Sequence, residues 1–546
     1  MSDVQARGGQ RFAATLVAGC LGVFVAQVAY SLPAAVIGTI QTTYNTSSSQ
    51  LTWVPASFAA AMVIFELTFG VLGDLFGRKQ LLLGGLALVA VGQVISYYSG
   101  TNVHTLWTGQ AIAGVGAGAL YPMSLTLIAA AAPDERVRAR AIALWAGFLS
   151  VGAAVSPIVA GTLATNGHWR VSFWLVVVAA VVALLASLPA VNSSAPQGRR
   201  LDIPGQVTLV VGLLALIWAL TQGSTEGYGS GKIIVGFIVA AVFLVAFVAI
   251  ETRTASPLVH LTLFRNRAFA VTGLVAVVGM FGYLGATFTM PIFIGSVLHV
   301  SPVKVGILFL FVQLPALALF PLVARLIHSV SPQMVLAAGF AVMGAGAVYA
   351  AIQTRPTAAW TDYIVPMLLV GIGFCFTVGS ITAVAINTVP LRLAGMASAT
   401  INLLRDFGFA LGPVIIGAIA TPIANNRLSD GLGAAIGSAG LTNPAAAGTV
   451  TGISKEGGAI AINSLPVIPG APGAAPLGQM PASVHELALS SLAHAYTVGF
   501  VVVAVAMFGS AVLAAVGLAG VRAVSPVEPS AEVMFEVSGV AQSVEG

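Results

Sequence analysis

Long apolar stretches separated by short polar segments run through the whole chain. Fourteen of them are close to or above the roughly 20 residues that an α-helix needs to cross the hydrocarbon core of a bilayer. They lie at 12–40, 53–73, 80–99, 104–131, 140–164, 169–191, 203–221, 233–250, 268–296, 303–326, 333–352, 361–388, 395–422 and 494–520. Because only helices satisfy their own backbone in lipid at this run length, the pattern predicts an all-α membrane protein with fourteen transmembrane helices.

Composition and charge agree with this prediction. The chain is 58% hydrophobic and 7% charged, against about 25% charged in a soluble domain. If the spans alternate, 15 of the 22 Lys and Arg residues fall on one side and 6 on the other, which places both termini in the cytoplasm. The bases are spread over loops, so the net charge of +5 predicts no nucleic-acid partner. We expect a monomer in the cytoplasmic membrane.

The runs fall into groups of six, two and six. We therefore expect a cytoplasmic N-terminus (1–11), an N-terminal six-helix bundle (12–191), an inserted two-helix hairpin with its linkers (192–267), a C-terminal six-helix bundle (268–520) and a cytoplasmic tail (521–546). The last bundle includes a long extracytoplasmic segment, 424–493, rich in Gly, Ala and Pro. Its composition favours a flexible loop, and a lid or docking surface over the outer mouth is the alternative.

The segment GVLGDLFGRK at 70–79 is a short polar hinge between the second and third runs. It resembles the loop between the second and third spans of the major facilitator superfamily, G-x-L-x-D-R-x-G-R-K, although Leu75 replaces a basic residue. The matching residues are Gly70, Leu72, Asp74, Gly77, Arg78 and Lys79. The segment PLVHLTLFRNR at 257–267 is similar to one typical of the fourteen-span branch, whose members are mostly drug:proton antiporters.

The resemblance implies the major facilitator fold, with two six-helix bundles and an inserted helix pair. It also implies that Asp74 helps to lock the bundles together on the cytoplasmic side, with the start of span thirteen near Leu393 as its partner. Arg78 and Lys79 would anchor the hinge to lipid phosphates or carboxylates. The simpler alternative is a helix-stop turn with positive-inside bases.

A second motif lies in the fifth run. Gly152, Pro157 and Gly161 match the antiporter signature G-x-x-x-G-P-x-x-G-G, with small residues at the other two positions. Small residues let helices approach closely and Pro kinks a span, so we expect a packing and gating device.

Three charged residues lie inside spans and away from their ends. Glu66 precedes Asp74 by eight residues, about 12 Å along a helix, and an ionised carboxylate at that depth is costly. Glu66 is therefore our candidate for proton coupling, with a structural, hydrogen-bonded acid as the alternative. Arg405 and Asp406 adjoin in span thirteen; either they neutralise each other or Arg405 pairs with Asp74 across the gap between the bundles.

Two charges typical of the family are missing. Gln110 stands where relatives carry an Arg in span four, and Phe24 stands where this branch carries an Asp in span one. Glu66 is then the main proton-carrier candidate of the N-terminal half. Uncharged polar residues within spans are candidates for lining the substrate cavity, or alternatively for hydrogen bonds between helices. They are Gln27, Tyr30, Gln110, Gln313 and Asn387.

These features predict a transporter and not an enzyme. We expect a secondary-active, multidrug-type exporter of hydrophobic or amphiphilic molecules, coupled to protons and working by alternating access. Its partners would be a lipophilic small molecule or lipid as substrate, protons and membrane lipids. The chain has no G-x-x-x-x-G-K-[ST] motif, and Cys20 and Cys375 lack metal-ligand spacing, so we expect no cofactor or metal. The alternatives are a lipid or glycolipid exporter of the same fold with weak or no proton coupling, and a non-transporting scaffold or sensor.

Overall fold

The computed structural model describes residues 2–194, 201–254, 257–389, 394–439, 444–468 and 480–520, and these residues are almost entirely helical. The first eight helices are α1 (Ser2–Tyr44), α2 (Ser48–Phe76), α3 (Arg78–Tyr97), α4 (Val103–Ala131), α5 (Glu135–Thr165), α6 (Val171–Ser187), α7 (Ile203–Glu226) and α8 (Gly231–Glu251). The next elements are η1 (Leu261–Arg265), α9 (Arg267–Ile292), η2 (Phe293–Val297), α10 (Pro302–Ser329), α11 (Pro332–Gln353), η3 (Trp360–Tyr363) and α12 (Ile364–Asn387). The last are α13 (Ala394–Ser438), α14 (Pro444–Asn463), the parallel strand pair β1 (Val467–Ile468) and β2 (Met480–Pro481), and α15 (Ala482–Gly517).

Polar residues at the ends of the apolar runs start the helices. Ser47 and Gln50 form a capping box at α2, and the Asp134 side chain accepts from the Val137 amide at α5. At α7 the Asp202 side chain accepts from the Gly205 amide. Each cap satisfies amides that the first helical turn leaves unpaired, so the predicted spans begin where apolar sequence follows a capping residue.

Twelve helices in the described residues are long and apolar enough to cross a membrane. Two further apolar stretches are shorter, namely α6 and the Pro302–Pro315 part of α10. Large apolar side chains stay exposed on outer helices, for example Val182 of α6, Val245 of α8 and Val512 of α15. Such a surface suits lipid and not water. The protein is therefore an all-helical, multi-pass membrane protein, and the prediction of fourteen spans goes two beyond the twelve that meet this criterion.

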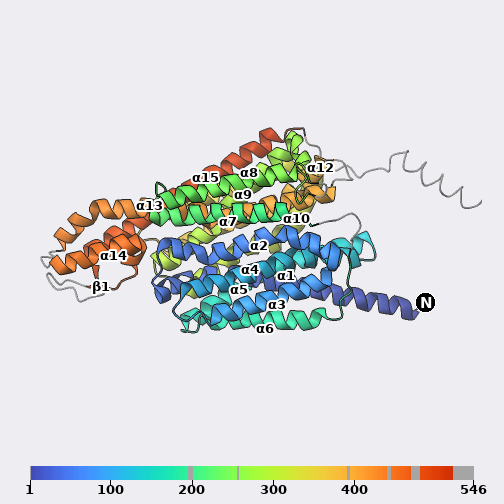
Figure 1. Ribbon diagram of the computed structural model, residues 1–546, viewed down its shortest axis with the longest axis horizontal. Coiled ribbons are helices and arrows are strands. Elements are labelled where there is room, and N and C mark those ends of the chain that lie inside the picture. The colour runs from blue at the N-terminus through green and yellow to red at the C-terminus, as the bar shows by residue number, and fades with distance from the viewer. Residues whose placement is uncertain are drawn as a thin grey trace, which may run out of the picture.

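Figure 1 shows α1–α6 together on one side of the molecule and α9, α12, α13 and α15 on the other. Within the first group α4 packs against both α2 and α3, and α1 packs against α5. Within the second group α13 packs against α9 and α15, and α11 packs against α12 and α15. The groups meet where α5 contacts α10 and α2 contacts α13. Helix α7 packs against α8 and lies against both α2 and α13.

The two ends of the helical domain differ. One end carries the turn at 70–79 and is called the hinge end. At the other, called the cap end, α14 and the short strand pair project beyond the remaining helices together with the end of α13 (Figure 1). Helix α13 has 45 residues, or about 67 Å at 1.5 Å per residue, which is more than twice a hydrocarbon core of about 30 Å.

The described parts of the segment at 424–493, namely 424–439, 444–468 and 480–493, differ from the flexible loop that its composition favours. Helix α13 continues to Ser438, α14 occupies Pro444–Asn463, and α15 begins at Ala482. Alanine is the strongest helix former, and apolar residues spaced along these helices, such as Leu428, Ile460 and Val484, are buried where the helices pack. The Gly, Ala and Pro content predicted a flexible loop, whereas burial of one face of each of these helices stabilises them.

Candidate functional site

Polar side chains from four helices meet in the interior between the two groups of helices. Tyr121 of α4 donates to Gln27 Oε1 of α1 at 2.8 Å. Arg405 of α13 donates to both carboxylate oxygens of Asp406, at 2.9 and 3.2 Å. Glu66 of α2 lies within hydrogen-bonding reach of Asp406 and interacts electrostatically with Arg405. We call these five residues the central cluster.

The central cluster holds two carboxyl groups and one guanidinium group. The Asp406 side chain is 8% exposed and the Arg405 side chain 24% exposed, and Glu66 Oε2 is buried without a hydrogen-bond partner. Arg405 balances one negative charge only. A carboxyl–carboxyl contact is repulsive when both groups are ionised and becomes a hydrogen bond when one holds a proton. The cluster can thus change its net charge by binding or releasing one proton.

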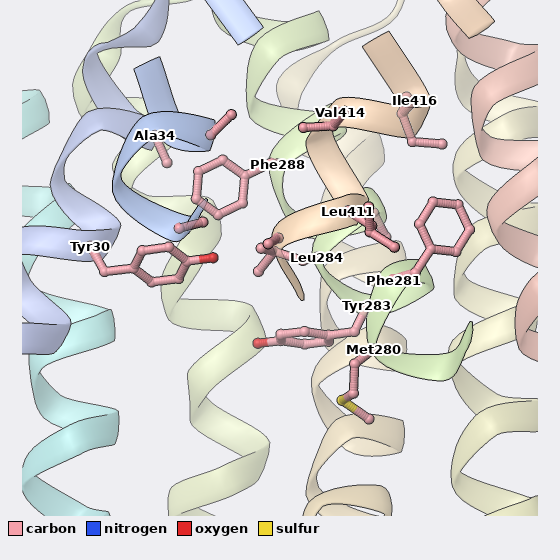
Figure 2. Close-up of a cluster of buried hydrophobic side chains, with 14 of the residues drawn as sticks. Tyr30, Ala34, Met280, Phe281, Tyr283, Leu284, Phe288, Leu411, Val414 and Ile416 are labelled. Carbon is pink, nitrogen blue, oxygen red and sulfur yellow. The ribbon is translucent and has the colours of Figure 1, made fainter. Parts of the chain in front are cut away.

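Aromatic side chains flank the central cluster. Tyr30 of α1 packs between Phe58 and Phe288, with ring centroids 5.4 and 5.9 Å away. Tyr283 of α9 stacks on Phe374 at 3.8 Å. Figure 2 shows the hydroxyl groups of Tyr30 and Tyr283 directed into the same space, with apolar side chains of α9 and α13 around them. The surroundings of the charges are therefore apolar and aromatic with a few hydroxyl groups.

The uncharged candidates from the sequence are divided among three places. Gln27 belongs to the central cluster and Tyr30 lies beside it. Gln313 lies close to the Tyr283 hydroxyl group at the edge of the same region. Gln110 is fully buried and donates to Ser96 of α3 at 3.0 Å, within the α3–α4 interface. Asn387 is the last residue of α12, so it lies at a helix end and not at mid-span.

Sequence reasoning missed two tyrosines of this site. Tyr121 and Tyr283 each lie inside a long apolar run, where a tyrosine is normally interpreted as a core residue without a functional role. The residues next to these tyrosines in the sequence could have identified them. Tyr121 follows the glycine-rich stretch 114–118 and precedes Pro122, and Tyr283 stands between Gly282 and Gly285. Such small residues mark places where helices approach closely and side chains near them are shared between helices.

The hinge is held by contacts within the first group of helices. Gly77 has φ 107°, and a Cβ atom there would lie under 3.0 Å from the Asn192 side chain, so both backbone and space require glycine. Asp74 accepts from Arg78 at 2.9 Å. The Lys79 amide donates to Asn192 Oδ1 at 3.1 Å, and its ammonium group donates to the Leu188 carbonyl.

The remaining hinge predictions have these outcomes. Gly70 has open space where a Cβ atom would stand. Arg78 contacts the Asp74 carboxylate, and Lys79 contacts the chain just after α6. The predicted partner of Asp74, the chain near Leu393, lies outside the described residues.

The motif of α5 packs against two different helices. A Cβ atom on Gly152 would lie 3.1 Å from the Phe24 carbonyl of α1. Farther along, α5 and α10 approach reciprocally: a Cβ atom on Gly161 would lie under 3.0 Å from the Pro302 carbonyl, and one on Gly306 under 3.0 Å from the Pro157 carbonyl. Backbone meets backbone there, so this pair of glycines closes the two groups of helices toward the cap end.

The packing of α5 loosens toward the hinge end. No residue at 142–151 is buried, whereas 152–164 includes a buried residue on every turn. Ten residues are almost three turns, so this part of α5 is less buried than the part that follows, although Trp145 and Phe148 still pack against Cys20 and Ile128. The structure is therefore tighter at the cap end than along the hinge half of α5.

In the described part of the chain no three His, Cys, Asp or Glu side chains gather in a way that could hold a metal ion. Cys20 and Cys375 are both buried and free. What the site offers is charge balance, hydroxyl groups and apolar surface.

Comparison with known sequences gives a consistent set of matches. Residues 19–413 match the profile of the Major Facilitator Superfamily. Multidrug resistance protein Stp of Mycobacterium tuberculosis is 28% identical over 411 residues, which are 74% of this chain and 75% of that protein. Multidrug resistance protein 3 of Bacillus subtilis is 26% identical over 426 residues, or 77% of this chain and 82% of that protein.

Comparison with solved structures supports the fold. The crystal structure of the POT family transporter PepTSo superposes with a TM-score of 0.59 at 13% identity, covering 93% of this chain and 98% of that one. A structure of a proton dependent oligopeptide transporter gives a TM-score of 0.56 at 14% identity, with the same coverage. At this identity the likeness concerns the arrangement of helices alone.

Proposed function

Since this chain belongs to the Major Facilitator Superfamily and is a membrane transporter of the drug-export type and not an enzyme, we propose that it exports hydrophobic or amphiphilic small molecules in exchange for protons. The central cluster carries this proposal. It combines a titratable carboxyl pair with aromatic and apolar surroundings at the seam between the two groups of helices.

The proposed architecture has fourteen spans, with α6 and α10 crossing in addition to the twelve long apolar helices. The bundles are 12–191 and 268–520, and the inserted hairpin with its linkers is 192–267. The protein lies in the cytoplasmic membrane, with both termini in the cytoplasm. The excess of basic residues on that side supports this orientation.

In the proposed cycle Glu66 is the proton carrier. When it is protonated, Arg405 neutralises Asp406 and the cluster has no net charge. When it is ionised, the cluster carries one negative charge, which favours water or a cationic substrate over lipid-like surroundings. Tyr30, Gln27, Tyr121, Tyr283 and Gln313 supply hydroxyl and amide groups for a substrate whose main surface is apolar.

Alternating access would use both ends of the molecule. The α5–α10 contact at Gly161 and Gly306 closes the cap end, and the hinge with Gly70, Asp74, Gly77, Arg78 and Lys79 locks the opposite end when the cap end opens. The loose packing along residues 142–151 supports an arrangement that opens toward the hinge end. In members of repeat-built transporter folds, such motion is mostly rocking of one bundle against the other.

A reconstituted flux assay tests the proposed function. Purified protein in proteoliposomes is given lipophilic cations, neutral lipophilic compounds and fluorescent lipids, with and without an imposed pH gradient. We expect uphill movement of lipophilic compounds only with the gradient. Gradient-independent transport of every substrate would contradict proton coupling, and binding without flux would make the protein a sensor or scaffold.

Closure at the cap end has its own test within α5. Gly161→Leu would push against backbone of α10, so we expect a loss of transport of at least tenfold. Gly147→Leu is the matched control, because a Cβ atom at Gly147 meets nothing within 4 Å, and we expect nearly normal transport. Equal activity of the two variants would refute the role of the α5–α10 contact.

One observation favours a second function, export of lipid. An apolar groove on the outer surface runs between α11 and α15, lined by Val348, Ile352, Val501, Val505 and Phe508. It has the chemistry to hold an acyl chain beside the C-terminal group of helices. Movement of the fluorescent lipids without that of lipophilic cations would favour this function.

A further inference from the structure

We propose that Asp202 and Glu251 form a second proton-binding site, which fastens the inserted hairpin to the chain that leads into α9. The site is separate from the central cluster. Its ligand is a single proton held between the two carboxyl groups, and binding of that proton keeps the base of the hairpin closed.

The two carboxyl groups are buried and oriented by the backbone. Asp202 and Glu251 are 5% and 3% exposed. Asp202 Oδ1 accepts from the Gly205 amide at 2.9 Å at the start of α7. Glu251 Oε2 accepts from the Val259 amide at 3.1 Å, just beyond the end of α8. Each group therefore uses one oxygen to hold its own segment in place.

The remaining oxygens face each other. Asp202 Oδ2 and Glu251 Oε1 are buried and have no donor. A Cβ atom on Gly205 would lie under 3.0 Å from both of them, so the two oxygens flank one point, and the carboxyl groups interact directly. Carboxylate oxygens only accept hydrogen bonds. A contact between them becomes favourable when one carries a proton, which it donates to the other.

Among the residues that the structure describes, none provides a positive charge to the pair. Glu251 is faced by Asp202 and by the backbone amides of Leu258 and Val259. Arg253, on the same short linker, is exposed, and neither acid forms an ion pair in the described part of the chain. Two buried, unpaired negative charges would be costly. A shared proton leaves one charge, which the amide donors of Gly205 and Val259 help to stabilise.

The position of the pair connects it to the transport helices. Gln206, one turn beyond Asp202, donates to the Ile64 carbonyl of α2 at 2.8 Å. Ile64 lies two residues before Glu66. Helix α7 also lies against α13, which carries Arg405 and Asp406. The pair thus holds the start of α7 against the linker while the next turn of α7 contacts the helix of the central cluster.

Infrared difference spectroscopy of the purified, full-length protein tests the site directly. A protonated carboxyl group has a C=O stretching band that ionised carboxylates lack. Spectra are recorded in a pH titration of the wild type, Glu251→Gln and Asp202→Asn. The control is Glu226→Gln, an acid at the other end of α7 that bonds to Gln222 and lies 3.8 Å from Lys232.

To separate this site from Glu66 of the central cluster, all spectra are compared with that of Glu66→Gln. We expect a titrating carboxylic-acid band in the wild type, Glu226→Gln and Glu66→Gln that is missing from Glu251→Gln and Asp202→Asn. Glu251→Gln keeps a neutral group with an N–H donor toward Asp202, so this variant should fold as well as the wild type. Persistence in both pair variants of the band that Glu66→Gln retains would overturn the proposal. A wild-type titration that moves with sodium concentration would also overturn it, because the site would then bind a metal cation.

The pH dependence of thermal stability is a second test of the site, and it does not rely on transport either. Thermal unfolding of the wild type should occur at lower temperature as the solution becomes alkaline, when the pair loses its proton and both groups are charged. Glu251→Gln should lose part of this dependence, whereas Glu66→Gln should retain it. If Glu251→Gln and wild type depend on pH alike, the pair does not bind the proton.

Discussion

The central cluster and the base of the inserted hairpin both bring two carboxyl groups into contact, and they differ in one residue type. Glu66 and Asp406 share Arg405, whereas the partners of Asp202 and Glu251 in the described part of the chain are each other and backbone amides. A pair with a guanidinium group tolerates either protonation state, since its net charge changes between zero and minus one. A pair without one changes between minus one and minus two, and the second state is costly when buried.

This difference predicts different uses of similar chemistry. A proton that enters and leaves in each transport cycle requires a site that is stable in both states, and the central cluster meets this requirement. A proton that holds two segments together requires a site that is stable in one state, which is the situation at Asp202 and Glu251. The arginine thus distinguishes a site that can bind and release a proton in each transport cycle from a site where a bound proton stabilises the structure.

The largest effect on stability is expected from removing that arginine. Arg405→Leu leaves two buried carboxyl groups without their cation and should cost about 3–5 kcal/mol of unfolding free energy. Unfolding of purified protein in detergent measures the change. Adding Asp406→Asn to the same chain should recover much of the loss.

The matched control for this variant is Arg355→Leu. Arg355 is 56% exposed and lies 3.4 Å from Asp362, so solvent screens the pair and its loss should cost less than about 1 kcal/mol. Equal destabilisation by Arg405→Leu and Arg355→Leu would mean that the central arginine has no special part in balancing charge.

A smaller effect is expected from crowding the hairpin pair. Gly205→Ala would place a Cβ atom between the two carboxyl groups, and overpacking of this kind costs about 1–3 kcal/mol. Gly231→Ala at the start of α8 is the control, because a Cβ atom there meets nothing within 4 Å. We expect lower thermal stability, with altered pH dependence, for the first variant alone. Unchanged unfolding of Gly205→Ala would contradict the close approach of the two carboxyl groups around Gly205.

The smallest effect is expected from cutting the connection between the two regions. Gln206→Leu removes the hydrogen bond to Ile64 and should cost about 0.5–1.5 kcal/mol. A double-mutant cycle with Glu66→Gln, read as the pH dependence of transport, measures whether the hairpin influences the central cluster. Strictly additive effects would show that the two proton sites are independent.

The sequence predicted the helices and the central charges better than it predicted their neighbours. Glu66, Arg405 and Asp406 were found because a charge inside an apolar run requires an explanation. In the structure Arg405 contacts Asp406, and Asp74 contacts Arg78. By contrast, Asp202 and Glu251 lie at the polar ends of their apolar runs, where an acidic residue is normally interpreted as marking the end of a helix. They are also 49 positions apart in the chain, so the sequence does not indicate that they are in contact.

Other residues could not be placed without coordinates because a helix has several faces. Gln110 and Gln27 have the same side-chain chemistry in similar runs, yet Gln27 bonds to Tyr121 in the central cluster and Gln110 bonds to Ser96 between α3 and α4. Pro157 and Gly161 were expected to pack helices, but the sequence did not show that their partner is α10. Partner identity depends on tertiary packing, which a periodic pattern does not specify.

Proton movement driven by substrate tests the central claim most directly. Proteoliposomes with an internal pH indicator receive an inward or outward gradient of a transported lipophilic cation, and no pH gradient is imposed. Wild type and Glu226→Gln should move protons opposite to the substrate, whereas Glu66→Gln should bind substrate and exchange it without a pH change. Substrate-driven proton movement of wild-type size in Glu66→Gln would contradict the account.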